Sequence, residues 1–169
     1  MSHEENYVFN SVHTVAAYLQ HLSSIQLSPI RTHKSLYYLF ACFGAYYGSI
    51  TQNNVHEGSL NYSNKLFPAR FEAWDSGPVI RDLFEENKDC YYNQEQISFS
   101  ILEIEKHNEV MLFIQELFEQ LSSLSEFTLR TISTSDECYI KARQSGMKTN
   151  EISMEEMFNE YKHKNLMNN

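Results

Sequence analysis

Apolar residues recur at intervals of three and four positions along most of the chain, which is the spacing of one face of an α-helix. The clearest stripe lies within residues 106–122, where Val110, Ile114 and Leu121 follow this spacing. The pattern predicts seven helices, which lie at 11–23, at 29–47, from 78 onward, at 106–122, at 126–133, from a capping box at 134–137 to Gly146, and from a second capping box at 153–156 to about 161.

The longest predicted helix, at 29–47, begins with a strong start signal. Ser28 is a favoured N-cap residue, and Pro29 suits the first helical position because its missing N–H would have no partner there. From Leu36 to Tyr47 the helix is almost continuously apolar. A helix that is apolar on every side is typical of a protein core, so we expect this helix at the centre of the fold.

The segments between the helices are mostly polar. Residues 48–64 are rich in Asn, Ser and Gly, residues 87–96 are polar, and both segments are predicted to be surface loops. A small β element is predicted around 66–74 or 97–104, where polar and apolar residues alternate imperfectly.

Composition agrees with a helical protein. The 169 residues include 5 glycines and 3 prolines, too few for an all-β protein built on tight turns, and 42% of the chain is hydrophobic. We therefore expect a mainly α fold, with a single compact domain of six or seven helices. Residues 1–9 form a lead-in, 10–162 the helical domain, and 163–169 a frayed tail.

Charge and cysteine content narrow the class of protein. The formal net charge is −9, which disfavours direct nucleic-acid binding and is compatible with plain solubility, a basic protein partner or mimicry of nucleic acid. Three widely spaced cysteines without a CxxC pair indicate a reduced, cytoplasmic protein. The polar start differs from a signal peptide, and we expect no membrane span because no apolar run is long enough.

Because the sequence contains no recognisable catalytic motif, we expect a protein that is not an enzyme, with no catalytic residues, no metal and no cofactor. Motifs for zinc proteases, serine hydrolases and phosphate-binding loops are absent from the sequence. His13 and His21 lie two turns apart on one predicted helix, which is a weak metal signal beside the ordinary alternative of surface histidines. Cys42 lies in an apolar stretch, where a thiol is usually inert, although a Cys–His pair formed in space stays open at this stage.

The least helix-like segment is 71–80, FEAWDSGPVI, which holds the chain's one tryptophan. We expect Trp74 to be a core residue that packs against the 29–47 helix. Gly77 and Pro78 then start the next helix and set its angle. A contact role for Trp74 on the surface is the alternative.

Four basic residues, Arg31, Lys34, Arg70 and Arg81, flank the two segments that are richest in aromatic residues. Arginine pairs with carboxylates through two hydrogen bonds, so this placement suits a protein contact site. Ordinary surface charge is the alternative interpretation.

Four segments together resemble the Panacea domain. Residues 34–40 read KSLYYLF, similar to the family's KLLYYAQ-like helix, and residues 72–79 read EAWDSGPV, similar to its EAWxxGPV element. Residues 129–143 resemble its LxxLSHxxxxWxxAR region, and 152–161 its closing IxxExMxxYY helix. The resemblance covers roughly residues 10–162.

The chain departs from the family pattern at three places. The leucine after the family's lysine is Ser35 here, and the serine–histidine step is Ser133-Thr134 without the histidine. Cys138-Tyr139 stands where the family has its aromatic residue. All but the first of these departures lie in the C-terminal half of the chain.

The resemblance implies a mostly helical domain found in antitoxins and in phage-associated or prophage-associated proteins, with no defining catalytic residues. Such antitoxins neutralise unrelated toxins by direct protein binding, and a related group hands a toxin to a protease as an adaptor. The resemblance and the aromatic and basic residues around it give a set of candidate signature or partner-binding residues: Lys34, Tyr37, Tyr38, Arg70, Trp74, Asp75, Gly77, Pro78 and Arg81.

Three functions stay open at this point. The leading hypothesis is a non-enzymatic, antitoxin-like module that binds a protein partner in a bacterial cell or phage-infected host. The alternative is a phage-encoded inhibitor of a host nuclease or defence system, of the anti-CRISPR or anti-restriction type, that works as an acidic nucleic-acid mimic. The third is a cryptic hydrolase or metal enzyme. The aromatic surplus is also compatible with a homodimer.

Overall fold

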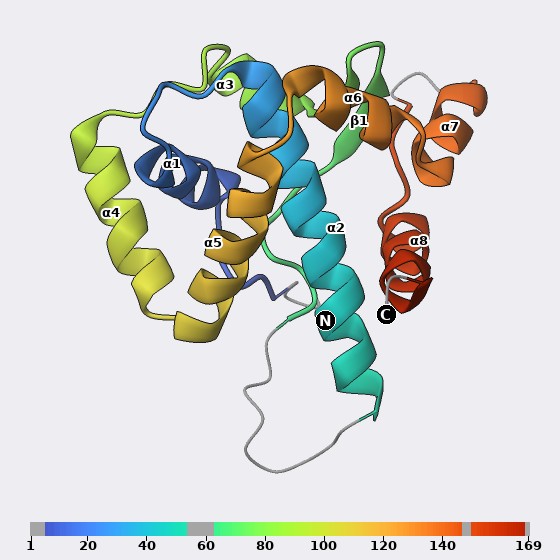
Figure 1. Cartoon of the computed structure of the whole chain (residues 1–169), viewed down its shortest axis with the longest axis horizontal. Helices are drawn as coiled ribbons and strands as arrows, with labels where there is room; N and C mark the ends of the chain where they lie inside the picture. Colours follow the sequence, from blue (N-terminus) through green and yellow to red (C-terminus); the bar gives the residue numbers. More distant parts are fainter. Residues whose placement is uncertain (1–5, 54–62, 147–149, 168–169) are drawn as a thin grey trace, which may run out of the picture.

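Helix α2 (Pro29–Asn53) crosses the centre of the molecule and contacts α1, α5, α6, α8 and strand β2 (Figure 1). The computed structural model describes residues 6–53, 63–146 and 150–167. Every residue at positions 32–41 of α2 is buried, as expected for a core helix. The predicted central helix is therefore confirmed, and it continues past Tyr47 to Asn53 because part of the predicted 48–64 loop is helical; residues 54–62 lie outside the described part.

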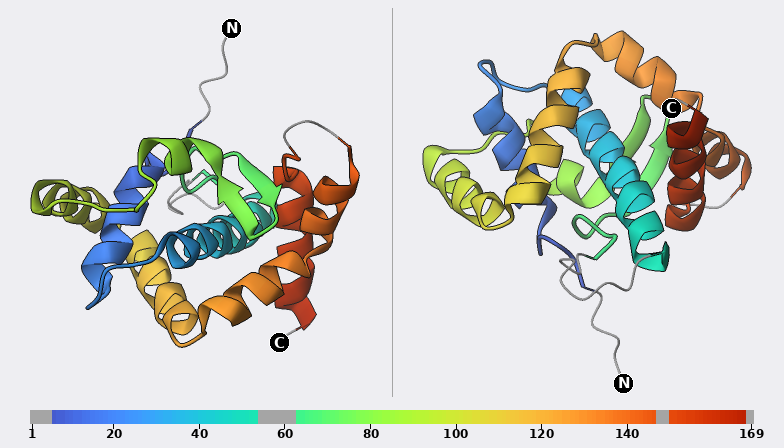
Figure 2. Two further views of the ribbon diagram at one scale, coloured as in Figure 1. Left: turned by 90° about the horizontal axis from the view of Figure 1, so that it is seen from above. Right: turned by 60° about the horizontal axis from the view of Figure 1, so that its bottom comes forward.

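The described residues form eight helices and one two-stranded antiparallel sheet, so the predicted mainly α class is confirmed. Seen from above, α1, α5, α6, α8 and the sheet surround α2 (Figure 2). The remaining elements are α1 (Val12–Leu22), β1 (Phe71–Trp74), β2 (Gly77–Ile80), α3 (Arg81–Glu86), α4 (Gln94–Glu105), α5 (Asn108–Ser122), α6 (Glu126–Thr134), α7 (Glu137–Gln144) and α8 (Met154–Met167).

Strands β1 and β2 form a hairpin in which Phe71 lies opposite Ile80 and Trp74 opposite Gly77. The other edge of β1 is covered by the segment before α8. Ala73 N donates to the Asn150 carbonyl at 2.9 Å, and Ile152 N donates to the Phe71 carbonyl at 2.8 Å. These bonds satisfy the strand edge and attach the C-terminal part of the chain to the hairpin.

The Gly77-Pro78 pair does not start a helix, which corrects the prediction. Pro78 lies in β2 opposite Ala73, and α3 begins at Arg81. Proline has no N–H to donate to Ala73 across the hairpin, but Ala73 has other partners. Its N–H donates to the Asn150 carbonyl, and its own carbonyl accepts from Arg143 Nη1 at 3.2 Å.

The β element predicted at 66–74 is present as β1, whereas the alternative at 97–104 is wrong. That segment lies in α4, whose N-terminus is fixed by a capping box between Asn93 and Gln96. The side chain of Asn93 accepts from Gln96 N at 2.8 Å, and the Gln96 side chain accepts from Asn93 N at 2.9 Å.

Both terminal segments make regular contacts in their described parts. In the lead-in, Val8 N and Phe9 N donate to the carbonyls of Lys65 and Leu66, and Phe9 is buried. The tail predicted to fray from 163 is helical as far as Met167. Residues 1–5 and 168–169 lie outside the described part.

Asp136 joins three parts of the fold through a carboxylate that has 0% exposure. The hydroxyls of Tyr37 in α2 and Tyr161 in α8 each donate to its Oδ2 at 2.7 Å, and Lys164 pairs with its Oδ1. Burial raises the pKa of both tyrosines far above the ordinary value, so both hydroxyls keep their protons. The capping box predicted at 134–137 is wrong: Thr134 ends α6 and its hydroxyl donates to the carbonyls of Arg130 and Thr131, while α7 begins at Glu137 with Asp136 as an N-cap residue that makes no side-chain cap bond.

Replacing Asp136 by asparagine should reduce the free energy of unfolding by about 3–5 kcal/mol, because an amide cannot offer an acceptor to every donor of this cluster. Urea unfolding followed by circular dichroism measures the change. The control is Asp89→Asn, at an exposed aspartate. Equal unfolding midpoints for the two variants would show that the cluster does not hold the fold.

His33 should make the protein sensitive to acid. Its Nδ1 accepts from Ile80 N at 3.2 Å, and burial lowers its pKa to about 4. The unfolded chain protonates His33 below its ordinary pKa of about 6.5, so stability is lost as the pH falls from there toward 4. Over this pH interval we expect the free energy of unfolding of the wild type to fall by about 3 kcal/mol more than that of the His33→Asn variant. His21→Asn, at an exposed histidine, should follow the wild-type slope.

Candidate functional site

The residues singled out from the sequence fall into two groups in the structure. Four lie at or near the surface beside the hairpin: Arg70, Trp74, Asp75 and Arg81. Five are buried: Lys34, Tyr37, Tyr38, Gly77 and Pro78. The second group holds the fold together, and only the first group is in a position to touch another molecule.

Lys34 is the side chain that attaches the hairpin to α2. It is 1% exposed, and its Nζ donates to the Pro78 carbonyl at 3.0 Å. Burial lowers the pKa of its ammonium to about 8. The prediction that Lys34 belongs to a surface contact site is therefore wrong, because its charge is enclosed beneath β2.

Gly77 leaves the space that Lys34 occupies. Its φ of +109° is rarely adopted by other residues, and a Cβ at this position would lie 2.7 Å from Lys34 Cε. Because Lys34 is enclosed and bonded to Pro78, it cannot withdraw without breaking that bond.

Tyr37 and Tyr38 fix α2 to the C-terminal half. Tyr37 belongs to the Asp136 cluster, and the Tyr38 hydroxyl donates to the Leu129 carbonyl of α6 at 3.1 Å. The two rings also meet edge to face, with centroids 5.5 Å apart. These contacts position helices, so both tyrosines are structural.

Trp74 is half-buried and lies outside the cluster of buried apolar residues, so the prediction of a core tryptophan is wrong. Its ring packs edge-on against Phe84 of α3 at 5.3 Å, and the Arg81 guanidinium lies 5.1 Å from its centroid. The packing against α2 expected of Trp74 is made instead by Phe71, which contacts Tyr37 and Phe40 at 5.5 and 5.4 Å.

The charged residues of the hairpin are held in fixed positions. Arg81 makes two 2.8 Å hydrogen bonds to the Glu72 carboxylate, and these bonds hold the pKa of Glu72 below its ordinary value. Arg143 of α7 pairs with Asp75 at 2.6 Å, and Arg130 of α6 donates to the Asp75 carbonyl at 3.2 Å. The turn is thus clamped by two helices that are distant in sequence.

We call the surface formed by Trp74, Asp75, Arg81, Arg130 and Arg143 the hairpin face. Part of it borders a shallow cavity of about 450 Å³, lined by Trp74, Asp75, Arg81 and Arg143 together with Glu72 and Asn150. Arg130 and Arg143 both lie within the motif at 129–143, but neither was among the candidate site residues predicted from the sequence. No local pattern connects either residue to position 75.

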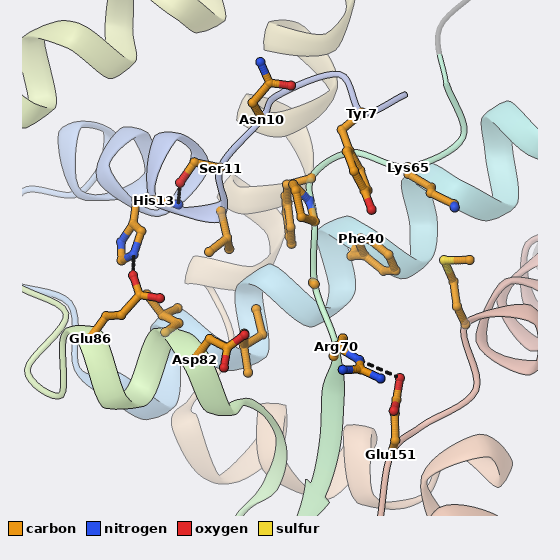
Figure 3. A pocket seen from close by; sticks show the side chains of 17 residues that line it. Tyr7, Asn10, Ser11, His13, Phe40, Lys65, Arg70, Asp82, Glu86 and Glu151 are labelled. Atoms are coloured by element: carbon orange, nitrogen blue, oxygen red, sulfur yellow. Dashed lines mark hydrogen bonds and ion pairs between the residues drawn. The ribbon is translucent and has the colours of Figure 1, made fainter. Parts of the chain in front are cut away.

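A second concave site lies beside α1 and α3, as Figure 3 shows. This cleft of about 520 Å³ has an apolar floor that includes Phe40 and Phe67, and polar side chains around its rim. His13 bonds to Glu86 at 2.6 Å and to the Tyr92 hydroxyl at 2.8 Å, while Arg70 pairs with Glu151 at 3.4 Å (Figure 3). Arg70 thus lies in this cleft, apart from the hairpin face.

Cysteine and histidine side chains often act as nucleophiles and bases in enzymes, so their environment in this protein is informative. Burial raises the pKa of Cys42 and of Cys138 to about 12, so both are protonated, weakly nucleophilic thiols at neutral pH. The ring of His21 lies against Tyr18, away from the His13 contacts. The described residues contain no group of three His, Cys, Asp or Glu side chains arranged to hold a metal ion.

Comparison of the chain with protein-family models, with curated proteins and with solved structures gives no match. The Panacea resemblance therefore stays a prediction that rests on the sequence motifs. Within the part of the chain that the structure covers, no helix combines the length and apolar character needed to cross a bilayer.

Replacing Gly77 by alanine should reduce the free energy of unfolding by about 2–4 kcal/mol, because both the backbone angle and the contact with Lys34 are unfavourable. Gly146→Ala is the control: its φ of +69° is also positive, but among the described residues no atom outside its chain neighbours lies within 4 Å of the added Cβ. The free energy of unfolding of this control variant should fall by only about 1–2 kcal/mol.

Making the same two substitutions in a Lys34→Ala background separates the cost of the backbone angle from the cost of the contact with Lys34. Without the lysine, the excess cost of Gly77→Ala over Gly146→Ala should fall, and the part that stays reflects the φ of +109° and the Ser133 Oγ atom 3.2 Å from the added Cβ. Equal costs at the two glycines in the wild-type background would contradict the packing role of Lys34.

Proposed function

We propose that this protein is a non-enzymatic binding module that neutralises a protein partner, in the manner of a Panacea antitoxin, by direct contact or by delivering the partner to a protease. The observation that carries the proposal is the hairpin face. It combines a half-buried tryptophan with three arginines on one rigid surface, and tryptophan and arginine are the residues most enriched at binding hot spots.

The rigidity of the hairpin face supports this function. The Tyr139 hydroxyl donates to the Trp74 carbonyl at 2.6 Å, and Arg143 holds both the Ala73 carbonyl and the Asp75 carboxylate. A surface that is already ordered before binding loses little conformational entropy when a partner docks. The partner should present carboxylates to the arginines and an apolar group to the Trp74 ring.

The second candidate function is inhibition of a nuclease or defence protein by mimicry of nucleic acid. The observation in its favour is the charge of α4 and α5, because residues 94–122 contain six glutamates and one lysine. A stretch of negative charge on exposed helices can compete with a phosphate backbone for a basic active site.

Co-expression with the product of the adjacent gene tests the leading proposal. We expect the neighbour to be toxic alone, to be neutralised by this protein, and to copurify with it. A neighbour that is harmless alone and does not copurify would count against the antitoxin function. If the bound partner is instead a nuclease that nucleic acid displaces, with affinity that falls steeply as salt rises, the second candidate is favoured.

Trp74→Ala should weaken binding of the copurified partner at least tenfold, because the ring supplies the apolar anchor of the hairpin face. The substitution should reduce the free energy of unfolding by only about 1–2 kcal/mol, since the ring is half-buried. Phe127→Ala removes an aromatic ring that is 77% exposed on α6 and serves as the control. Calorimetric titration and thermal melting measure the two effects, and unchanged affinity in Trp74→Ala would remove the hairpin face from the interface.

A further inference from the structure

A groove is lined by residues of α2 and α5. Helix α5 and the hairpin lie on different sides of α2 (Figure 2). The groove has a volume of about 480 Å³. Its apolar lining is Cys42, Tyr46 and Tyr47 of α2 with Leu112, Phe113 and Leu117 of α5, and its polar lining is Glu109, Glu116 and Gln120.

The groove exists because the apolar surface of α5 extends beyond its fully buried stripe. That stripe, formed by Val110, Ile114, Phe118 and Leu121, is buried in the core. Phe113 and Leu117 flank it, pack partly buried against the core and also line the groove, and Leu112 beyond them is exposed. This edge of α5 therefore offers apolar surface to another molecule.

The floor of the groove is rigid and its edges are open. Phe113 packs edge-on against Phe43 at 5.6 Å, and Phe43 stacks on Tyr47 at 4.3 Å. Above this aromatic floor, Tyr46 is 49% exposed and Leu112 is 46% exposed. Such a surface offers apolar area without needing to rearrange.

The charge around the groove is of one sign. Glu109 and Glu116 lie two turns apart on the same side of α5, and the described residues that line the groove include no lysine or arginine. A second copy of this chain would place glutamates against glutamates across the groove, which is repulsive. An occupant with positive charge beside its apolar side chains is complementary.

We propose that this groove binds a basic amphipathic α-helix of the partner protein. Such a helix places leucine or phenylalanine at positions i, i+3, i+4 and i+7 against Tyr46, Leu112 and Leu117, with lysine or arginine beside Glu109 and Glu116. The inference rests on the proposed binding function and adds to it a second surface and the chemistry of the segment that the surface accepts.

A synthetic helical peptide of about four turns tests the groove directly, since that length spans the two turns between the glutamates. The probe carries leucines at i, i+3, i+4 and i+7 with flanking lysines, and a matched peptide carries glutamate in place of every lysine. Fluorescence anisotropy with the full-length protein should show the basic peptide binding at least tenfold tighter, with an affinity that falls as salt rises.

Three variants locate the binding on the protein. Leu112→Ala and the double variant Glu109→Lys/Glu116→Lys should each weaken the basic peptide at least tenfold. Glu119→Lys is the matched control, because Glu119 is an exposed residue of α5 outside the groove lining, and it should change affinity less than twofold. Circular dichroism and melting temperature verify that each variant is folded.

Several outcomes would overturn the proposal. They are an absence of peptide binding, equal binding of the two peptides, or an equal loss in Glu119→Lys and in the double variant. A dimer detected by sedimentation that Leu112→Ala abolishes would assign the groove to a second copy instead.

The copurified partner separates this inference from the proposed function. If the partner binds the double variant as well as the wild type but loses affinity for Trp74→Ala, the groove inference fails and the proposed function stands. If the basic peptide binds the groove while no partner is neutralised, the proposed function fails and the groove stands.

Discussion

The bond between the Lys34 ammonium and the Pro78 carbonyl is the interaction on which the rest of the structure depends. It encloses a charge beneath β2 and so needs a position without a side chain above it, which Gly77 supplies. Because this bond attaches the hairpin to the central helix, it also sets where Trp74 and Arg81 emerge at the surface. A buried residue with no access to solvent therefore determines the geometry of the exposed face.

The remaining attachments of the hairpin come from the second half of the chain. Arg130, Tyr139 and Arg143 bind the backbone or side chains of the turn region, and their helices are in turn held to α2 through the Asp136 cluster. The hairpin face and the α2–α5 groove thus share one central helix but differ in chemistry. One presents arginines around an aromatic ring, and the other presents glutamates around an apolar floor.

Much of the helical fold could be predicted from local pattern, and most of the candidate site could not. The stripe of α5 and the apolar run of α2 are properties of single segments, so their spacing identified them. Gly77-Pro78 also matches a helix start locally, and it became a strand because Ala73 finds its partners in Asn150 and Arg143, more than sixty residues away. Thr134 and Glu137 have the local spacing of a capping box, yet α7 begins at Glu137, and the carboxylate of Asp136 between them accepts hydrogen bonds from tyrosines of α2 and α8. Contacts between distant segments decided these cases.

The position of α8 in the chain has a consequence for the order of events during synthesis. Two donors to Asp136, Tyr161 and Lys164, lie in this last described helix, and the segment just before it covers the edge of β1. A nascent chain on the ribosome that has not yet released α8 therefore lacks two of the three side-chain donors to Asp136 and leaves the outer edge of β1 uncovered. The hairpin face receives its last supports only after α8 has emerged, and until then the face of α2 that α8 covers is open to chaperones and proteases.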